Sequence, residues 1–227
     1  MDRRIRLKVC CVASVEEARL AIDHGADALG LVARMPTGPG PIGDDLIREI
    51  AARVPPPIAT FLLTSQTEPD AVVDHVRRTG VNTVQLVDDA ILPMVYDALR
   101  RATPHVRIVQ VIHVLDDASV GIALAAAPRV DALLLDSGNP AARELGGTGR
   151  AHDWAISRRI VEASPVPVFL AGGLNDANVR QALAATQPFG VDLCSGVRTN
   201  GSLDAEKLGR FVRAVRAASN QPAPIAG

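Results

Sequence analysis

The chain has 227 residues, of which 48% are hydrophobic and 22% are charged, and its formal net charge is −1. This composition supports a sizeable core and excludes a disordered chain. The net charge is near zero, whereas proteins that bind nucleic acid or anionic membranes usually carry an excess of basic residues. Aromatic residues make up only 3%, too few for a base-stacking surface, so we expect no nucleic-acid partner.

Short β-branched segments alternate with longer segments of helical periodicity along the chain. The predicted strands are, in order, Arg6–Cys10, Ala28–Ala33, Ile58–Leu62, Thr83–Val87, Arg107–Val111, Asp131–Leu135, Val166–Leu170 and Val191–Cys194. The predicted helices are Ser14–His24, Asp44–Arg53, Pro69–Thr79, Ala90–Arg101, Asp117–Ala127, Trp154–Ala163, Asp176–Ala185 and Asp204–Ala218. This alternation is typical of βαβ units around a parallel sheet.

Eight strand–helix pairs leave roughly 28 residues for each unit, enough for a strand, a helix and two short loops. The sequence therefore predicts an α/β fold, a single-domain (β/α)8 TIM barrel, over residues 1–218. Residues 219–227 lack periodicity and contain two prolines, so we expect a flexible C-terminal tail there.

Capping residues mark the ends of two of the predicted helices. Ser14 and Glu17 have the spacing of a capping box, and Gly25 follows the same helix, where a left-handed residue is favoured. Pro69 lies in the first turn of the third predicted helix, and Gly80 follows its last turn. These signals support the predicted boundaries of both helices.

The three cysteines, Cys10, Cys11 and Cys194, cannot form a disulfide framework, because their number is odd and two are adjacent. Cysteines that form no disulfide favour a reducing compartment. The N-terminal segment lacks the apolar run of a signal peptide, and the longest apolar runs are far shorter than the ~20 residues that span a bilayer. We therefore expect a cytoplasmic protein with no membrane partner.

Three glycine-containing segments, 146–149, 171–176 and 195–197, follow the last three predicted strands. Unhindered backbone N–H groups near a helix N-terminus form an anion site, and in barrels a phosphate commonly binds after strands seven and eight. The alternative for each segment is a simple turn, with Asp176 as the N-cap of the next helix. His152 lies beside the first segment and is a further candidate for contacting a ligand.

Two strand ends carry residues suited to acid–base chemistry. Cys10 ends the first predicted strand with Lys8 on the same face, and a thiol near a cation can act as a base or nucleophile; the alternative is a small buried hydrophobe. Asp136 follows the apolar run of the sixth strand, a catalytic position in a barrel, and the alternative is a loop cap. Together they could flank a substrate as acid and base. No spacing of His, Cys and Asp predicts a metal site.

Ten short motifs, read in order, resemble the phosphoribosylanthranilate isomerase family from the first strand to the last helix. They are Lys8–Cys10, Gly25–Gly30, Val84–Leu86, Leu133–Asp136, Gly146–Gly149, Asp153–Trp154, Leu170–Leu174, Asn178–Val179, Gly190–Asp192 and Ser195–Val197. Each motif alone is unspecific, but their combination is specific.

This resemblance implies a cofactor-independent aldose–ketose isomerase of tryptophan biosynthesis. It would convert N-(5-phosphoribosyl)anthranilate to 1-(2-carboxyphenylamino)-1-deoxyribulose phosphate by an Amadori rearrangement. Asp136 would be the general acid that opens the sugar ring, and Cys10 the general base that removes the C2′ proton. The groups implied to hold the phosphate are those of Gly147, Thr148, Gly149, Gly172, Gly173, Ser195 and Gly196. Family members occur as monomers and homodimers, and both states stay open.

The chain departs from the family pattern at four places. Cys11 and Arg198 stand where Gly and Glu are usual, and Val87–Asp88 stands for His-Gly. Gly38–Gly40 replaces a Ser-Pro-Arg whose Arg recognises the anthranilate carboxylate. Arg34 and Arg198 are the candidates for the missing cation. The alternatives to the family activity are a paralogue that isomerises another phosphosugar and a phosphate-ligand-binding barrel without catalysis.

Overall fold

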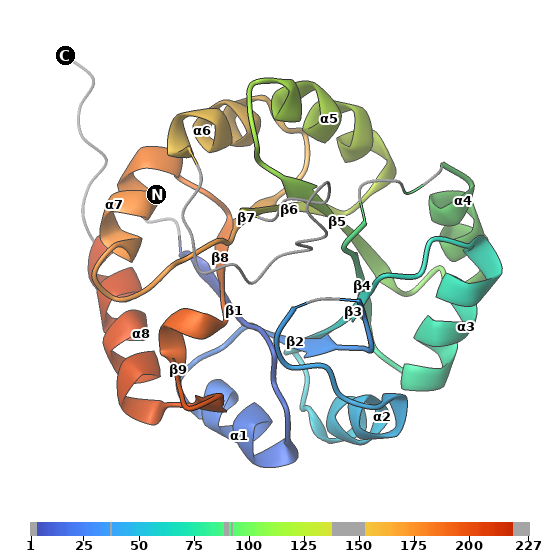
Figure 1. Cartoon of the computed structure of the whole chain (residues 1–227), viewed down its shortest axis with the longest axis horizontal. Helices are drawn as coiled ribbons and strands as arrows, with labels where there is room; N and C mark the ends of the chain where they lie inside the picture. Colours follow the sequence, from blue (N-terminus) through green and yellow to red (C-terminus); the bar gives the residue numbers. More distant parts are fainter. Residues whose placement is uncertain (1–3, 37, 89–90, 92, 138–152, 220–227) are drawn as a thin grey trace.

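Figure 1 shows the strands as an inner ring with the helices arranged around them. The computed structural model describes residues 4–36, 38–88, 91, 93–137 and 153–219. Strands β1 to β8 pair in parallel in chain order, and β8 pairs with β1 to close the barrel. The predicted (β/α)8 barrel is therefore confirmed.

The elements follow the predicted alternation closely. The barrel strands are β1 (Arg6–Val9), β2 (Ala28–Val32), β3 (Ala59–Thr64), β4 (Thr83–Leu86), β5 (Arg107–His113), β6 (Ala132–Asp136), β7 (Val168–Leu170) and β8 (Gly190–Leu193). The helices are α1 (Val15–Asp23), α2 (Asp44–Arg53), α3 (Pro69–Thr79), α4 (Pro93–Ala102), α5 (Ala118–Ala126), α6 (Trp154–Ala163), α7 (Val179–Thr186) and α8 (Ala205–Ser219). Shorter elements are η1 (Ala127–Arg129), η3 (Ser195–Val197), β9 (Arg198–Thr199) and β10 (Ser202–Leu203).

Capping chemistry explains where two of these helices begin and end. Ser14 Oγ accepts the backbone N–H of Glu17 at 3.1 Å, as the capping box predicts. The reciprocal bond differs, because the Glu17 carboxylate accepts the N–H of Ala13 at 3.0 Å. Gly80 ends α3 in the left-handed conformation with φ of 67°, which a glycine adopts without steric cost.

The start of α7 differs from the prediction that placed Asp176 at the N-cap. The Asn175 side chain accepts the backbone N–H groups of Ala177 at 2.9 Å and Asn178 at 3.1 Å. These two bonds stabilise a turn, so the helix begins at Val179. Asp176 instead forms an ion pair with Arg210 of α8 at 2.8 Å.

Apolar side chains fill two layers. One layer lies between the strands and the helices and contains large aliphatic residues such as Leu62, Leu133 and Ile160. The other fills the inside of the barrel, where the Phe61 and Phe169 rings pack edge to face with centroids 6.1 Å apart. Alternation along each strand sends successive side chains into the two layers. Among the described helices, none is long and apolar enough to cross a membrane.

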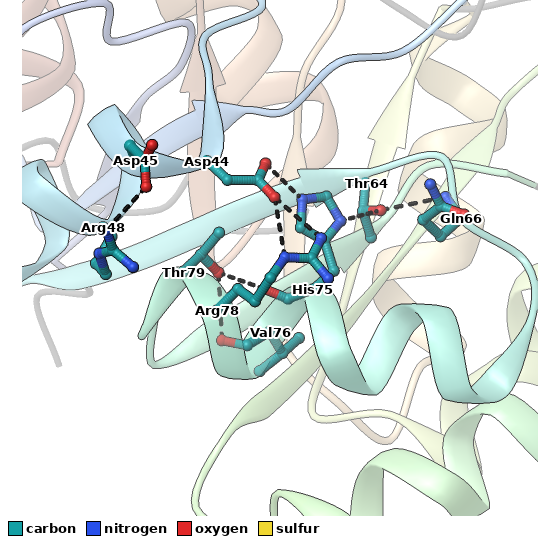
Figure 2. Close-up of polar contacts among 9 residues, drawn as sticks. All are labelled: Asp44, Asp45, Arg48, Thr64, Gln66, His75, Val76, Arg78 and Thr79. Carbon is teal, nitrogen blue, oxygen red and sulfur yellow. Dashed lines mark hydrogen bonds and ion pairs between the residues drawn. The ribbon is translucent and has the colours of Figure 1, made fainter.

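A buried histidine network joins β3, α2 and α3 (Figure 2). The Nδ1 atom of His75 lies 3.0 Å from Thr64 Oγ1, and its Nε2 atom lies 3.1 Å from Asp44 Oδ1. Arg78 also donates to the Asp44 carboxylate, at 3.0 Å. Burial raises the pKa of Asp44, but the hydrogen bonds and charges of Arg78 and His75 outweigh it and lower that pKa. The network therefore holds the start of α2, which directly follows the segment 33–43.

We expect His75→Ala to lower the free energy of unfolding by about 2 kcal/mol, because it removes a buried ring that joins three elements. Urea denaturation followed by circular dichroism measures this change. The control is Arg48→Ala, which breaks an exposed ion pair with Asp45 and is expected to cost less than about 0.5 kcal/mol. Equal losses for the two variants would contradict a structural role for the network.

Candidate active site

A cavity at the carboxyl end of the barrel brings together the side chains predicted to act as acid and base. Cys10, which follows β1, and Asp136, which ends β6, both line it. The wall is completed by groups that follow β2, β7 and β8, including Pro39, Gly173 and Ser195. In barrels of this class the carboxyl ends of the strands carry the chemistry, so this cavity is the candidate active site.

Cys10 is fixed at the base of the cavity by the pairing of β1 with β8. Its backbone N–H donates to Leu193 O at 2.8 Å, and its side chain is only 6% exposed. A Cβ atom at Gly30 would lie 2.7 Å from Cys10 Sγ and 3.0 Å from Lys8 Nζ. Gly30 therefore leaves the space that the thiol and the ammonium group occupy.

Lys8 and Asp192 form an ion pair inside the barrel, beneath Cys10. The Lys8 Nζ atom lies 2.9 Å from Asp192 Oδ2, and Lys8 is completely buried. Burial alone would lower the pKa of Lys8, but Asp192 and Cys10 outweigh it and raise the pKa, so the ammonium stays charged. Asp192 is absent from the predicted site residues. The signal that the sequence offered was a carboxylate between the apolar residues Val191 and Leu193 of the last predicted strand.

Asp136 ends β6 with its carboxylate partly exposed toward the cavity. Its Oδ1 atom accepts the backbone N–H of Ser137 at 2.7 Å. In the parallel register Asp136 lies opposite His113 of β5. The remaining oxygen can thus face a bound molecule while the first oxygen holds the rotamer.

Glycines after β7 and a serine after β8 present backbone groups to the same cavity. Gly172 and Gly173 have φ values of 82° and 62°, which favour glycine, and both line the cavity with Ser195. Gly196 packs behind Ser195, where a Cβ atom would lie 2.1 Å from Leu174 O. The predicted contacts of Gly147, Thr148, Gly149 and His152 lie outside the described residues.

Arg198 braces the segments that follow β8 and β1, and its place in ligand recognition stays a prediction. Its two Nη atoms each lie 3.0 Å from an oxygen of Glu17. They also donate to the backbone oxygens of Cys10, Cys11 and Gly201. These protein acceptors occupy the Nη donors, whereas the buried Nε–H of Arg198 has no hydrogen-bond partner among the described residues.

The described lining of the cavity carries negative but no positive side chains. Its charged members are Asp136 and Asp192. Arg34, the other predicted cation, is exposed and directly precedes Met35, which lines the cavity. In the ranges that the structure describes, no group of three or more His, Cys, Asp or Glu residues could hold a metal ion.

Comparisons with known proteins agree with this geometry. Residues 7–214 match the family model described as N-(5'phosphoribosyl)anthranilate (PRA) isomerase. The chain is 37% identical over 210 residues to N-(5'-phosphoribosyl)anthranilate isomerase 2 of Methanosarcina mazei, covering 92% of each chain. It is 36% identical to the N-(5'-phosphoribosyl)anthranilate isomerase of Haloferax volcanii, covering 94% of each. The N-(5'-phosphoribosyl)anthranilate isomerase structure from Pyrococcus furiosus is 26% identical with a TM-score of 0.79, over 94% of this chain and 99% of that one.

The brace makes a prediction about stability and pH. Burial raises the pKa of Glu17, but hydrogen bonds from Arg198 and from the N–H groups of Leu203 and Ala13 outweigh it and lower the pKa. Glu17→Gln is expected to lower the free energy of unfolding at pH 7 by about 1.5–3 kcal/mol, because it weakens hydrogen bonds to a charged group. Denaturant titrations at several pH values measure this change.

The pH dependence has a defined sign. A carboxylate with a lowered folded-state pKa stabilises the fold above the unfolded-state pKa of about 4.3, and this stabilisation is lost as the pH falls through the folded-state pKa. The difference between Glu17→Gln and the parent should therefore shrink below about pH 4. Glu16→Gln, at the neighbouring exposed carboxylate, is the control and should change stability little. A pH-independent deficit in Glu17→Gln would argue against the ionised brace.

Proposed function

The chain belongs to the N-(5′-phosphoribosyl)anthranilate isomerase family, and we propose that it isomerises this substrate with Asp136 as general acid and Cys10 as general base. The product is the 1-(2-carboxyphenylamino)-1-deoxyribulose phosphate of tryptophan biosynthesis. The observation that supports the residue roles is that a carboxylate and a thiol from two non-adjacent strands line one cavity. Groups on separate strands can reach two different atoms of one sugar.

In the first step Asp136 donates a proton to the furanose ring oxygen. The bond between that oxygen and C1′ breaks, and the nitrogen lone pair forms a C=N bond, which gives the protonated Schiff base. The bond that Asp136 accepts from Ser137 N–H leaves its second oxygen for this transfer. The residue ends the step as a carboxylate.

In the second step the Cys10 thiolate removes the proton from C2′. The electrons of the C–H bond form the C1′=C2′ bond and neutralise the Schiff base, which gives an enolamine. Transfer of the enol proton and protonation at C1′ then complete the ketone. Gly30 on β2 supports this role, because it leaves Cys10 Sγ room beside the cavity.

The phosphate is proposed to bind to backbone groups of Gly172, Gly173 and Ser195. Their support is the left-handed conformation of the two glycines and their shared place on the cavity wall. Asn178 Nδ2 donates to Gly173 O at 2.9 Å, which holds that peptide in a fixed orientation. Gly147, Thr148, Gly149 and Gly196 stay predictions for the same anion.

The anthranilate carboxylate needs a different partner from the phosphate. Arg34 is proposed for it, because it precedes Met35 on the cavity wall while its exposed side chain is free to turn. A hydrogen bond to a charged group contributes about 1.5–3 kcal/mol, so this contact would matter for affinity. His152, cytoplasmic location and a monomeric or homodimeric state stay predictions.

Replacing either member of the acid–base pair should abolish most turnover. Cys10→Ser and Asp136→Asn are each expected to lower kcat by about 100-fold to 10,000-fold, because positioned proton transfer contributes that much. Steady-state kinetics on freshly prepared substrate measures the loss, and growth of a tryptophan auxotroph that lacks the isomerase tests the activity in cells. Asp131→Asn is the control, since Asp131 directly precedes β6, at the end of the strand opposite Asp136, and pairs with Arg100 and Arg107. Unchanged kcat in a folded Cys10→Ser or Asp136→Asn variant would refute the assigned role.

The phosphate site makes a prediction that separates charge from size. Ser195→Asp is expected to raise KM and the inhibition constant of inorganic phosphate at least about 10-fold, because a carboxylate repels the bound anion. Ser195→Asn, which has nearly the same shape without the charge, should raise both constants much less. Equal effects of the two variants would place the phosphate elsewhere.

A further inference from the structure

Three thiols from two strand ends meet at the cavity wall. Cys10 and Cys11 follow β1 and Cys194 follows β8, and these strands pair with Val9 opposite Leu193. All three cysteines line the cavity and none is in a disulfide. The neighbouring thiols of Cys10 and Cys194 raise the pKa of the Cys11 thiol, and burial raises it further. The proposed mechanism uses only Cys10, so two thiols have no assigned role.

The backbone holds Cys11 toward its neighbours. Cys11 has a φ of 61°, a left-handed conformation that is uncommon for a residue with a side chain. Its carbonyl oxygen accepts a hydrogen bond from Arg198. On its other side, a Cβ atom at Gly40 would lie 2.7 Å from Cys11 Cβ. These contacts restrict the movement of Cys11.

Cys194 has the surroundings of a reactive thiol. It is partly exposed and lines the cavity, so a small oxidant can reach it. The neighbouring Cys11 thiol lowers the pKa of the Cys194 thiol, and the Arg198 guanidinium adds to this effect, while burial opposes it. A thiol beside a cation is more often the reactive thiolate. The pair thus consists of an attacking thiolate and a neighbouring thiol that can resolve its oxidised form.

We propose that Cys194 and Cys11 are a redox modification site, at which a peroxide forms a reversible disulfide that lowers isomerase activity. The Cys194 thiolate attacks hydrogen peroxide, the O–O bond breaks, and after proton uptake the products are Cys194 sulfenic acid and water. The Cys11 sulfur then attacks the Cys194 sulfur, and the S–O bond breaks. The disulfide forms, and the hydroxyl group leaves with the thiol proton as a second water. A dithiol reductant restores both thiols by exchange.

Geometry favours this pair over the alternatives. Adjacent residues in a trans peptide have Cα atoms about 3.8 Å apart, below the roughly 4.4–6.8 Å that disulfides adopt, so a Cys10–Cys11 bond is disfavoured. Cys10 Sγ lies against Gly30 of β2, whereas Cys194 follows β8, which pairs with β1 on the side opposite β2. Cys11 is therefore the better partner of Cys194. Because Cys11 is bonded directly to Cys10, the new crosslink changes the position of the proposed base.

The test treats the folded protein with hydrogen peroxide and reads both the crosslink and the activity. After tryptic digestion, the disulfide should join the peptides 9–19 and 181–198, and the intact mass should fall by two hydrogen atoms. Activity should fall at least 10-fold and return with dithiothreitol. The activity readout rests on the proposed function, whereas the mass readout does not, so a protein without isomerase activity would still report the crosslink.

Three variants identify the bonded pair. Cys194→Ser and Cys11→Gly should form no crosslink, and glycine suits the left-handed conformation at position 11. Cys10→Ser should still form it. A crosslink that survives in Cys11→Gly but not in Cys10→Ser would assign the bond to Cys10 and overturn the proposal. Absence of a crosslink in the parent protein would also overturn it, as would a complete crosslink that leaves activity unchanged.

Discussion

The barrel closes where β8 pairs with β1, and the active site is built across this junction between strands far apart in the sequence. The pairing sets Lys8 opposite Asp192 inside the barrel, where the two form a buried ion pair. Moving two charges out of water is costly, so such a pair is tolerated only when each charge meets its partner. A shift of one residue would send these side chains to the other face of the sheet. The ion pair therefore penalises other registers and keeps Cys10 beside Leu193.

A second set of contacts extends this junction beyond the strands. Glu17 at the start of α1 receives both Nη groups of Arg198 and the backbone N–H of Leu203. Arg198 in turn donates to the carbonyl oxygens of Cys10 and Cys11. The proposed base, Cys10, thus lies on a backbone that is held both by the strand pairing and by the contacts of Arg198 and Glu17. Such support limits the misplacement that makes proton transfer slow.

Features that depend on local sequence could be predicted, whereas features that depend on contacts between distant residues could not. The alternation of β-branched and helical segments predicted each barrel unit, and an acidic residue after an apolar strand indicated Asp136. The brace role of Arg198 was not predictable, because Glu17 lies 181 residues away in the chain. Asp192 was overlooked for a similar reason, since its partner Lys8 belongs to the strand that closes the barrel. The start of α7 was misplaced because Asn175, not Asp176, forms the side-chain bonds to the turn.

The close approach of Cys11 and Gly40 makes the order of sequence changes matter. Gly40 lies so near Cys11 Cβ that a side chain at position 40 requires the cysteine to shift, while Cys11 itself holds a backbone conformation suited to glycine. Glycine at position 11 would remove the contact with Cys11 Cβ, but a side chain at position 40 would still meet the backbone of residue 11 and would hold a φ of 74°. The two positions form an epistatic pair, because a substitution at one of them changes which substitutions the other tolerates.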